Sequence, residues 1–169
     1  IEQEGTYTLP EAQLDRFLFR IHVGYPSSAD EIEICRRAST EYAFVPQAVL
    51  SAEDLMRMQK LVRRVPAADH VYEFAVKLAR MTRPEEKRLP PELEKMVQWG
   101  AGPRAGIFLM LAARARAILN KRHHATTEDV AAVALPVLRH RIIPSFNAEA
   151  AGITTDQIII QLLKLMSGS

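Results

Sequence analysis

The sequence predicts a mainly helical fold, a helical bundle preceded by a short segment of α/β character that contains one strand. Two observations support this. From Ser28 onward, apolar residues recur every three or four positions in stretches that open with capping and acidic residues, as amphipathic helices do. Before Ser28, only the run over 17–23 alternates apolar with basic residues, as a half-buried strand does.

The order of the expected elements follows from caps and breakers. Ser51 and Thr126 precede acidic residues and predict helix starts, and Thr154 opens a capping-box pattern. Pro136 is expected to kink or divide the helix that contains it. In chain order, the elements are a helical turn over 10–16, the strand over 17–23, and helices over 28–38, 51–65, 68–83, 92–99, 103–119, 126–138 and 154–166, with irregular chain over 143–152.

The composition is that of an ordinary soluble globular domain, with 48% hydrophobic and 25% charged residues among 169. Because Cys35 is the only cysteine, no intrachain disulfide can form, and we expect the cytoplasm as the compartment. No apolar run approaches the roughly 18 residues that cross a bilayer, so no membrane span is expected. The net charge of +2 is too small to indicate nucleic acid by itself.

Arg104 is the first candidate functional residue. It follows Pro103 at the start of a predicted helix, and at 100° per residue it falls on the same face as Ile107 and Leu111. A cation there opposes the helix dipole and points to the expected packing side, so an anion should compensate it. One interpretation is phosphate binding at the helix N-terminus. The other is a pair with a carboxylate or carbonyl group in a domain interface.

Arg16 is the second candidate, because it lies directly before the predicted strand. An arginine in this place could reach a phosphate bound by a neighbouring subunit, as arginine fingers do. The alternative is a surface ion pair with Asp15 or Glu11.

Two further groups carry charge or metal-binding side chains. The segment 139–141, Arg-His-Arg, could contact phosphate or nucleic acid, although cations are also expected near a helix C-terminus. His123 and His124 are adjacent, so their rings point apart, and no cysteine or third histidine completes a ligand set. We therefore expect no metal site.

Taken together, several short blocks resemble the C-terminal part of a MoxR-type AAA+ ATPase. Their order and spacing match the family over nearly the whole chain. One departure is Gly102, where the family usually has Ser. The blocks are Gly5-Thr6-Tyr7-Thr8-Leu9-Pro10-Glu11-Ala12-Gln13-Leu14-Asp15-Arg16-Phe17, Val23-Gly24-Tyr25-Pro26, Met81-Thr82-Arg83, Trp99-Gly100-Ala101-Gly102-Pro103-Arg104-Ala105 and Val137-Leu138-Arg139-His140-Arg141-Ile142.

The resemblance implies a division of the chain and a role for each arginine. Residues 1–26 would end the α/β ATPase core with its last strand, 27–83 would supply connecting helices, and 84–169 would form the helical lid. Arg16 would be the arginine finger acting on the neighbouring subunit. Arg104 would be the second-sensor arginine on the ATP phosphates, at a helix start formed by Gly102 and Pro103.

The resemblance also implies ATP and Mg²⁺ in the full-length protein, a homo-oligomeric, hexameric ring, and a chaperone-like role on a client protein complex, with nucleic acid not expected as a partner. The phosphate-loop pattern G-x-x-x-x-G-K-[ST] and the metal-binding acidic strand do not occur in the sequence, so this chain alone is expected to bind no nucleotide and to be inactive. The alternative is a stand-alone helical binding module that uses its Arg-rich surface for nucleic acid or protein; a steep salt dependence of DNA binding would favour it.

Overall fold

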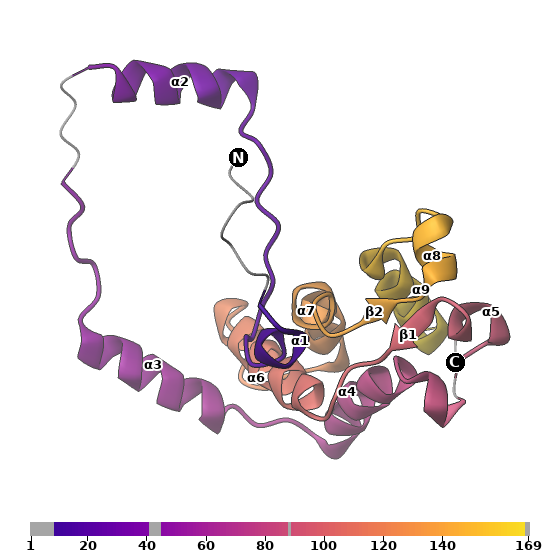
Figure 1. Ribbon diagram of the computed structural model, residues 1–169. Helices are drawn as coiled ribbons and strands as arrows, with labels where there is room; N and C mark the ends of the chain where they lie inside the picture. Colours follow the sequence, from indigo (N-terminus) through magenta and orange to yellow (C-terminus); the bar gives the residue numbers. More distant parts are fainter. Residues whose placement is uncertain (1–8, 41–44, 88, 168–169) are drawn as a thin grey trace. The chain divides into compact units, whose positions relative to one another are not determined.

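The computed structural model describes residues 9–40, 45–87 and 89–167 (Figure 1). The first four residues of the block that begins at Gly5, Gly5–Thr8, lie outside these ranges. The chain forms two compact units, which we describe separately. The smaller unit is Ile21–Gln59, and the larger unit joins the chain up to Arg20 with the chain from Lys60 onward.

The smaller unit consists of helices without a buried core among its described residues. It holds α2 (Ser28–Ala38) and most of α3 (Ala52–Arg64), and neither helix has a buried residue. The cap predicted at Ser51 is confirmed, because its hydroxyl accepts a hydrogen bond from the Asp54 N–H at 3.0 Å. At α2 the cap is Ser27, one residue earlier than expected.

The larger unit contains the hydrophobic core, which lies among four helices. Figure 1 shows α6 and α7 together, with α4 beside them; α6 packs against α7 and α4, and α7 also packs against α4 and α9. Large side chains that are fully buried include Leu78, Leu109, Val130, Leu138, Ile158, Ile159 and Leu162. The helices of this unit are α1 (Glu11–Leu14), α4 (Asp69–Met81), the 3₁₀ helix η1 (Pro84–Glu86), α5 (Pro91–Glu94), α6 (Arg104–Leu119), α7 (Thr127–Leu138), α8 (Phe146–Ala150) and α9 (Thr155–Ser167).

A small antiparallel sheet replaces two of the expected features. The helix expected over 92–99 ends at Glu94, and Val97–Trp99 forms strand β1. The region expected to be irregular contains β2 (Ile143–Pro144) and α8 instead. β1 pairs with β2, and the Ser145 N–H donates to the Met96 carbonyl at 2.9 Å. These partners lie far away in the sequence, which is why local periodicity did not reveal them.

The strand expected over 17–23 does not form. This segment has neither helix nor strand structure, and no other strand lies beside it among the described residues. Its backbone is held at Arg20, whose N–H donates to the Pro136 carbonyl at 2.9 Å. A strand needs a neighbour for its N–H and C=O groups, so an alternating pattern alone is insufficient.

Helix α7 continues through Pro136 to Leu138, so the proline does not divide it.

The packing face of α6 also differs from the expected one. The buried positions are mainly alanines, together with Leu109 and Met110, whereas Ile107 is 60% exposed. Apolar residues surround most of this helix, so their spacing does not identify a face. Small side chains let α4 and α7 approach closely, and this decides which side is buried.

The loop before α6 is fastened to the end of α4. The Thr82 hydroxyl accepts a hydrogen bond from the Ala101 N–H at 2.8 Å, and Arg83 Nε donates to the Ala101 carbonyl at 2.8 Å. Gly100 packs so closely that a Cβ atom there would lie 2.3 Å from the Thr82 carbonyl oxygen. The direction in which α6 starts is therefore fixed by α4.

The start of α7 is fixed by the buried carboxylate of Asp129, which is fully inaccessible. It accepts hydrogen bonds from Arg116 at 2.6 Å, from Arg122 at 2.7 Å and from the Thr126 N–H at 3.0 Å. Burial by itself raises the pKa of Asp129, but the hydrogen bonds from Arg122, Arg116 and Thr126 outweigh it and lower the pKa to about 2. The carboxylate thus stays ionised and joins the end of α6 to α7.

Replacing this carboxylate should destabilise the larger unit. Asp129→Asn leaves two arginines without their counter-charge, and we expect the free energy of unfolding to fall by about 3 kcal/mol in urea titrations at pH 7. Because the folded pKa is lower than the unfolded value near 3.9, the wild-type contribution is present above about pH 4 and is lost as the pH falls towards 2. Glu128→Gln, at an exposed position of the same turn, is the control. It should change neither the free energy of unfolding at pH 7 nor the loss of stability between about pH 4 and pH 2.

Gly100 should not tolerate a methyl group. Gly100→Ala would force the α4 end and the loop apart, so we expect about 1–3 kcal/mol of destabilisation by thermal or urea unfolding. Gly106→Ala is the matched control, since its Cβ would meet only a Val76 methyl group at 3.8 Å. Within a helix that change should stabilise slightly. Equal effects of the two substitutions would contradict the close packing at Gly100.

Candidate functional site

Arg104 stands at the first position of α6 and reaches out of the core. Its side chain is 46% exposed, and Nη1 donates a hydrogen bond to Oδ2 of Asp15 at 2.6 Å. The expectation that Arg104 faces the packing side of its helix is therefore wrong, because the buried face is the alanine side. The carboxylate partner is nonetheless the kind of compensation that the sequence required.

Asp15 is held from the opposite side by a second arginine, Arg141, whose side chain is only 1% exposed. Nε of Arg141 donates to Oδ1 of Asp15 at 3.0 Å, and Nη2 donates to the Asp15 carbonyl at 2.9 Å. The guanidinium also donates to the carbonyls of Phe17 and Val137 and lies 4.9 Å from the centre of the Phe108 ring. Burial lowers the pKa of Arg141, and the charge of Asp15 opposes this shift.

Further contacts tie the chain after Asp15 to the end of α7. His140 Nε2 lies 3.0 Å from the Phe17 carbonyl, and Arg139 Nη1 donates to the Arg20 carbonyl at 3.3 Å. Burial lowers the pKa of His140, although the hydrogen bond to the Phe17 carbonyl opposes this shift. Arg139 is itself fixed by two hydrogen bonds to Asp156, at 3.0 and 2.9 Å. The basic segment 139–141 thus serves as an anchor for residues 15–20.

Arg16, in the middle of this anchored segment, keeps its side chain exposed. The alternative that paired it with Asp15 or Glu11 is wrong for the described residues, because neither carboxylate forms an ion pair with Arg16 there and Asp15 binds Arg104 and Arg141 instead. In the described parts of the chain, no carboxylate forms an ion pair with Arg16. Arg104 therefore binds the residue that directly precedes Arg16 in the sequence.

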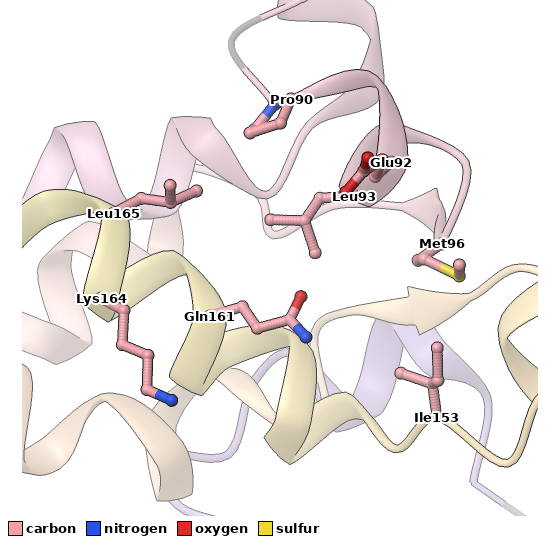
Figure 2. A pocket seen from close by; sticks show the side chains of 8 residues that line it. All are labelled: Pro90, Glu92, Leu93, Met96, Ile153, Gln161, Lys164 and Leu165. Atoms are coloured by element: carbon pink, nitrogen blue, oxygen red, sulfur yellow. The ribbon is translucent and has the colours of Figure 1, made fainter.

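A hollow of about 340 Å³ is lined by residues that include Asp15 and Arg141, whereas Arg16 and Arg104 are not among its lining residues. Gly102 lies in its wall, and no atom stands within 4 Å of where its Cβ would be. A larger groove of about 610 Å³ lies elsewhere, between α5 and α9. Figure 2 shows Leu93 at its centre and Lys164 pointing away from it. None of the predicted site residues lines that groove, so the arginine cluster is the candidate site.

Neither metal ligands nor a membrane span are found among the described residues. No three His, Cys, Asp or Glu side chains gather where they could hold a metal ion. No helix in the same ranges is both long and apolar enough to cross a bilayer.

Two residues of the site, Asp15 and Arg141, have a different part in the structure from the one considered in the sequence analysis. Asp15 was considered there as a partner of Arg16, and Arg141 as one of three residues that could contact phosphate or nucleic acid. The signal that could have identified Asp15 is the expected need of Arg104 for an anion, because an arginine at a helix start opposes the helix dipole and Asp15 is a carboxylate that can compensate it. Nothing in the local sequence distinguishes the buried Arg141, which binds Asp15, from the partly buried Arg139, which binds Asp156.

Comparison with known proteins identifies the larger unit. Residues 92–162 match the family model for the AAA lid domain. The crystal structure of a candidate ATPase from Cytophaga hutchinsonii superimposes with a TM-score of 0.85 at 38% identity, over 97% of this chain and 50% of that one.

Curated relatives align over most of this chain. It is 37% identical to the chaperone MoxR1 of Mycobacterium tuberculosis over 99% of its length, covering 44% of that protein. It is 32% identical to the protein MoxR of Methylorubrum extorquens over 94% of its length, covering 50% of that protein. The chain therefore spans about half the length of these relatives. The chain is thus similar over nearly its whole length to part of the MoxR proteins, and residues 92–162 match the AAA lid domain.

Proposed function

We propose that this chain is the lid portion of a ring-forming ATPase that helps to assemble or activate protein complexes. The proposal draws on the chaperone name of the mycobacterial relative and on the lid match over 92–162. ATP and Mg²⁺ would be bound with the rest of the protein, because the sequence contains no phosphate loop and no metal-binding acidic strand. The chain alone would then be inactive.

Arg104 is proposed as the second-sensor arginine that binds the ATP phosphates of its own subunit. The observation that carries this is its exposure at the start of α6, where Asp15 is its one hydrogen-bond partner among the described residues. A guanidinium has five N–H donors, so Nε and Nη2 can still serve a phosphate. Gly102 and Pro103 would line the approach, since nothing crowds Gly102 and the helix start favours anions.

Arg16 is proposed as the arginine finger that acts on the ATP of the neighbouring subunit. Its support is an exposed, uncompensated side chain on a backbone that Arg141 and His140 hold in place. A finger needs both properties, because it must reach outward and must keep its position when charge develops on the γ-phosphate.

Several coarser features belong to the same proposal. Residues 1–26 would complete the ATPase core, 27–83 would connect it to the lid, and 84–169 would form the lid. The parent protein would be a hexameric ring in the cytoplasm that acts on a client protein complex rather than on nucleic acid.

The alternative, a binding module for nucleic acid or protein, has weaker support. Many of the arginines that would form its basic surface pair with carboxylates, among them Arg36, Arg37, Arg80, Arg116, Arg122 and Arg139. A phosphate backbone would have to displace those carboxylates one by one. Tight DNA binding that weakens steeply with salt would favour this alternative.

Arg104→Ala in the full-length protein should weaken nucleotide binding and lower turnover together. Losing charge-assisted hydrogen bonds to phosphate should reduce the affinity for a non-hydrolysable ATP analogue by about tenfold, measured by calorimetry. Arg20→Ala is the control, because that side chain makes no hydrogen bond or ion pair with any described residue. Unchanged affinity in Arg104→Ala would remove Arg104 from the phosphate site.

Arg16→Ala should leave nucleotide affinity nearly unchanged and reduce turnover by about 10³-fold, as loss of an arginine finger does. Rings that mix Arg16→Ala subunits with subunits lacking the phosphate-loop lysine should regain partial activity, because some interfaces then combine an intact loop with an intact finger. Arg104→Ala subunits should gain nothing in the same mixture, since their loop lies in their own chain. Verified mixed rings without any recovery would leave Arg16 a structural residue only.

A further inference from the structure

Asp15 connects two arginines of very different character. Its Oδ1 accepts from Arg141, which is buried, and its Oδ2 accepts from Arg104, which is half-exposed. The two cations lie close enough for the charge of Arg104 to lower the pKa of Arg141, although burial is the larger cause. Without the carboxylate between them, these guanidinium groups would repel each other.

The two contacts of Asp15 differ in how easily they can be exchanged. Arg141 holds both the side chain and the carbonyl of Asp15, and it also binds Phe17 and Val137. Removing it would leave a buried charge without a partner, which is costly. Arg104 gives Asp15 one hydrogen bond from a side chain that is 46% exposed. Such a half-exposed pair contributes little, so an anion of higher charge can displace the carboxylate.

We propose that Asp15 is a positioning residue that competes with phosphate for Arg104 and thereby links the state of Arg104 to the segment that carries Arg16. The proposal rests on the proposed phosphate-binding role of Arg104. With phosphate absent, Asp15 holds Arg104; when phosphate arrives, Arg104 moves to it while Arg141 retains Asp15. Because Arg16 is the next residue, a change in the bonding of Asp15 reaches the finger directly.

The test is the affinity of the full-length protein for a non-hydrolysable ATP analogue with Mg²⁺, measured in a double-mutant cycle. Asp15→Asn removes the competing charge but keeps an oxygen that can accept from Arg141. We expect it to tighten binding by about two- to fivefold, the effect of losing a half-exposed ion pair. In the Arg104→Ala background the same substitution should change the affinity by less than its error. Turnover of Asp15→Asn should fall despite the tighter binding.

Glu11→Gln is the matched control, because Glu11 begins the short helix that Asp15 caps, lines the same hollow and is exposed. It removes an equal charge without touching Arg104 and should leave the affinity unchanged. Weaker binding by Asp15→Asn would overturn the proposal, because a competing carboxylate can only weaken binding in the wild type. An equal change in both backgrounds would overturn it too, because the effect would then not depend on Arg104. If instead Arg104→Ala alone has no effect on affinity, the proposed role of Arg104 fails, independently of Asp15.

Discussion

The guanidinium of Arg141 constrains how distant parts of the larger unit meet. A charge with 1% of its side chain exposed must be neutralised and must have its donors satisfied, and the partners that do so are the carboxylate of Asp15 and carbonyl groups on both sides. Asp15 lies 126 positions away in the sequence. The planar fork of an arginine holds five N–H donors in fixed directions, whereas a lysine has three rotatable donors on one nitrogen. The placement of residues 15–17, and with them Arg16, follows from this one side chain.

Asp129 is a second buried charge that must be neutralised. It is negative instead of positive, and its partners lie nearer to it in the sequence. It is a buried anion surrounded by Arg116 and Arg122, which lie 13 and 7 positions away. Its network therefore fixes a local connection, the turn from α6 into α7, and leaves the distant segments untouched. The two buried charges thus stabilise different connections. Asp129 joins the end of α6 to α7, and Arg141 attaches residues 15–17 to the end of α7.

The elements with local signals were predictable from the sequence. Thr154 and Gln157 form the capping interaction expected of them, with the Thr154 N–H donating to the Gln157 side chain at 2.8 Å, and α6 begins directly after Pro103. What failed depended on partners elsewhere in the chain. The β1–β2 pair joins segments more than forty residues apart, and the packing face of α6 was set by its neighbours rather than by its own pattern. The site was predicted in part. Arg16 and Arg104 were identified from the sequence, but the pairing of Asp15 with Arg104 was not, because the two residues are 89 positions apart.

The contrast between Arg104 and Arg141 gives the site its chemical character. Both bind Asp15, yet one is half-exposed with a single bond and the other is buried with bonds to four groups. A buried, saturated guanidinium cannot change partner without a large free-energy cost, whereas an exposed one with unused donors can. The start of α6 is meanwhile rigid, because Thr82 and Arg83 hold Ala101. Of the two arginines that share Asp15, Arg104 is therefore the one that can exchange its partner under the proposal made above, while Arg141 keeps the carboxylate in place.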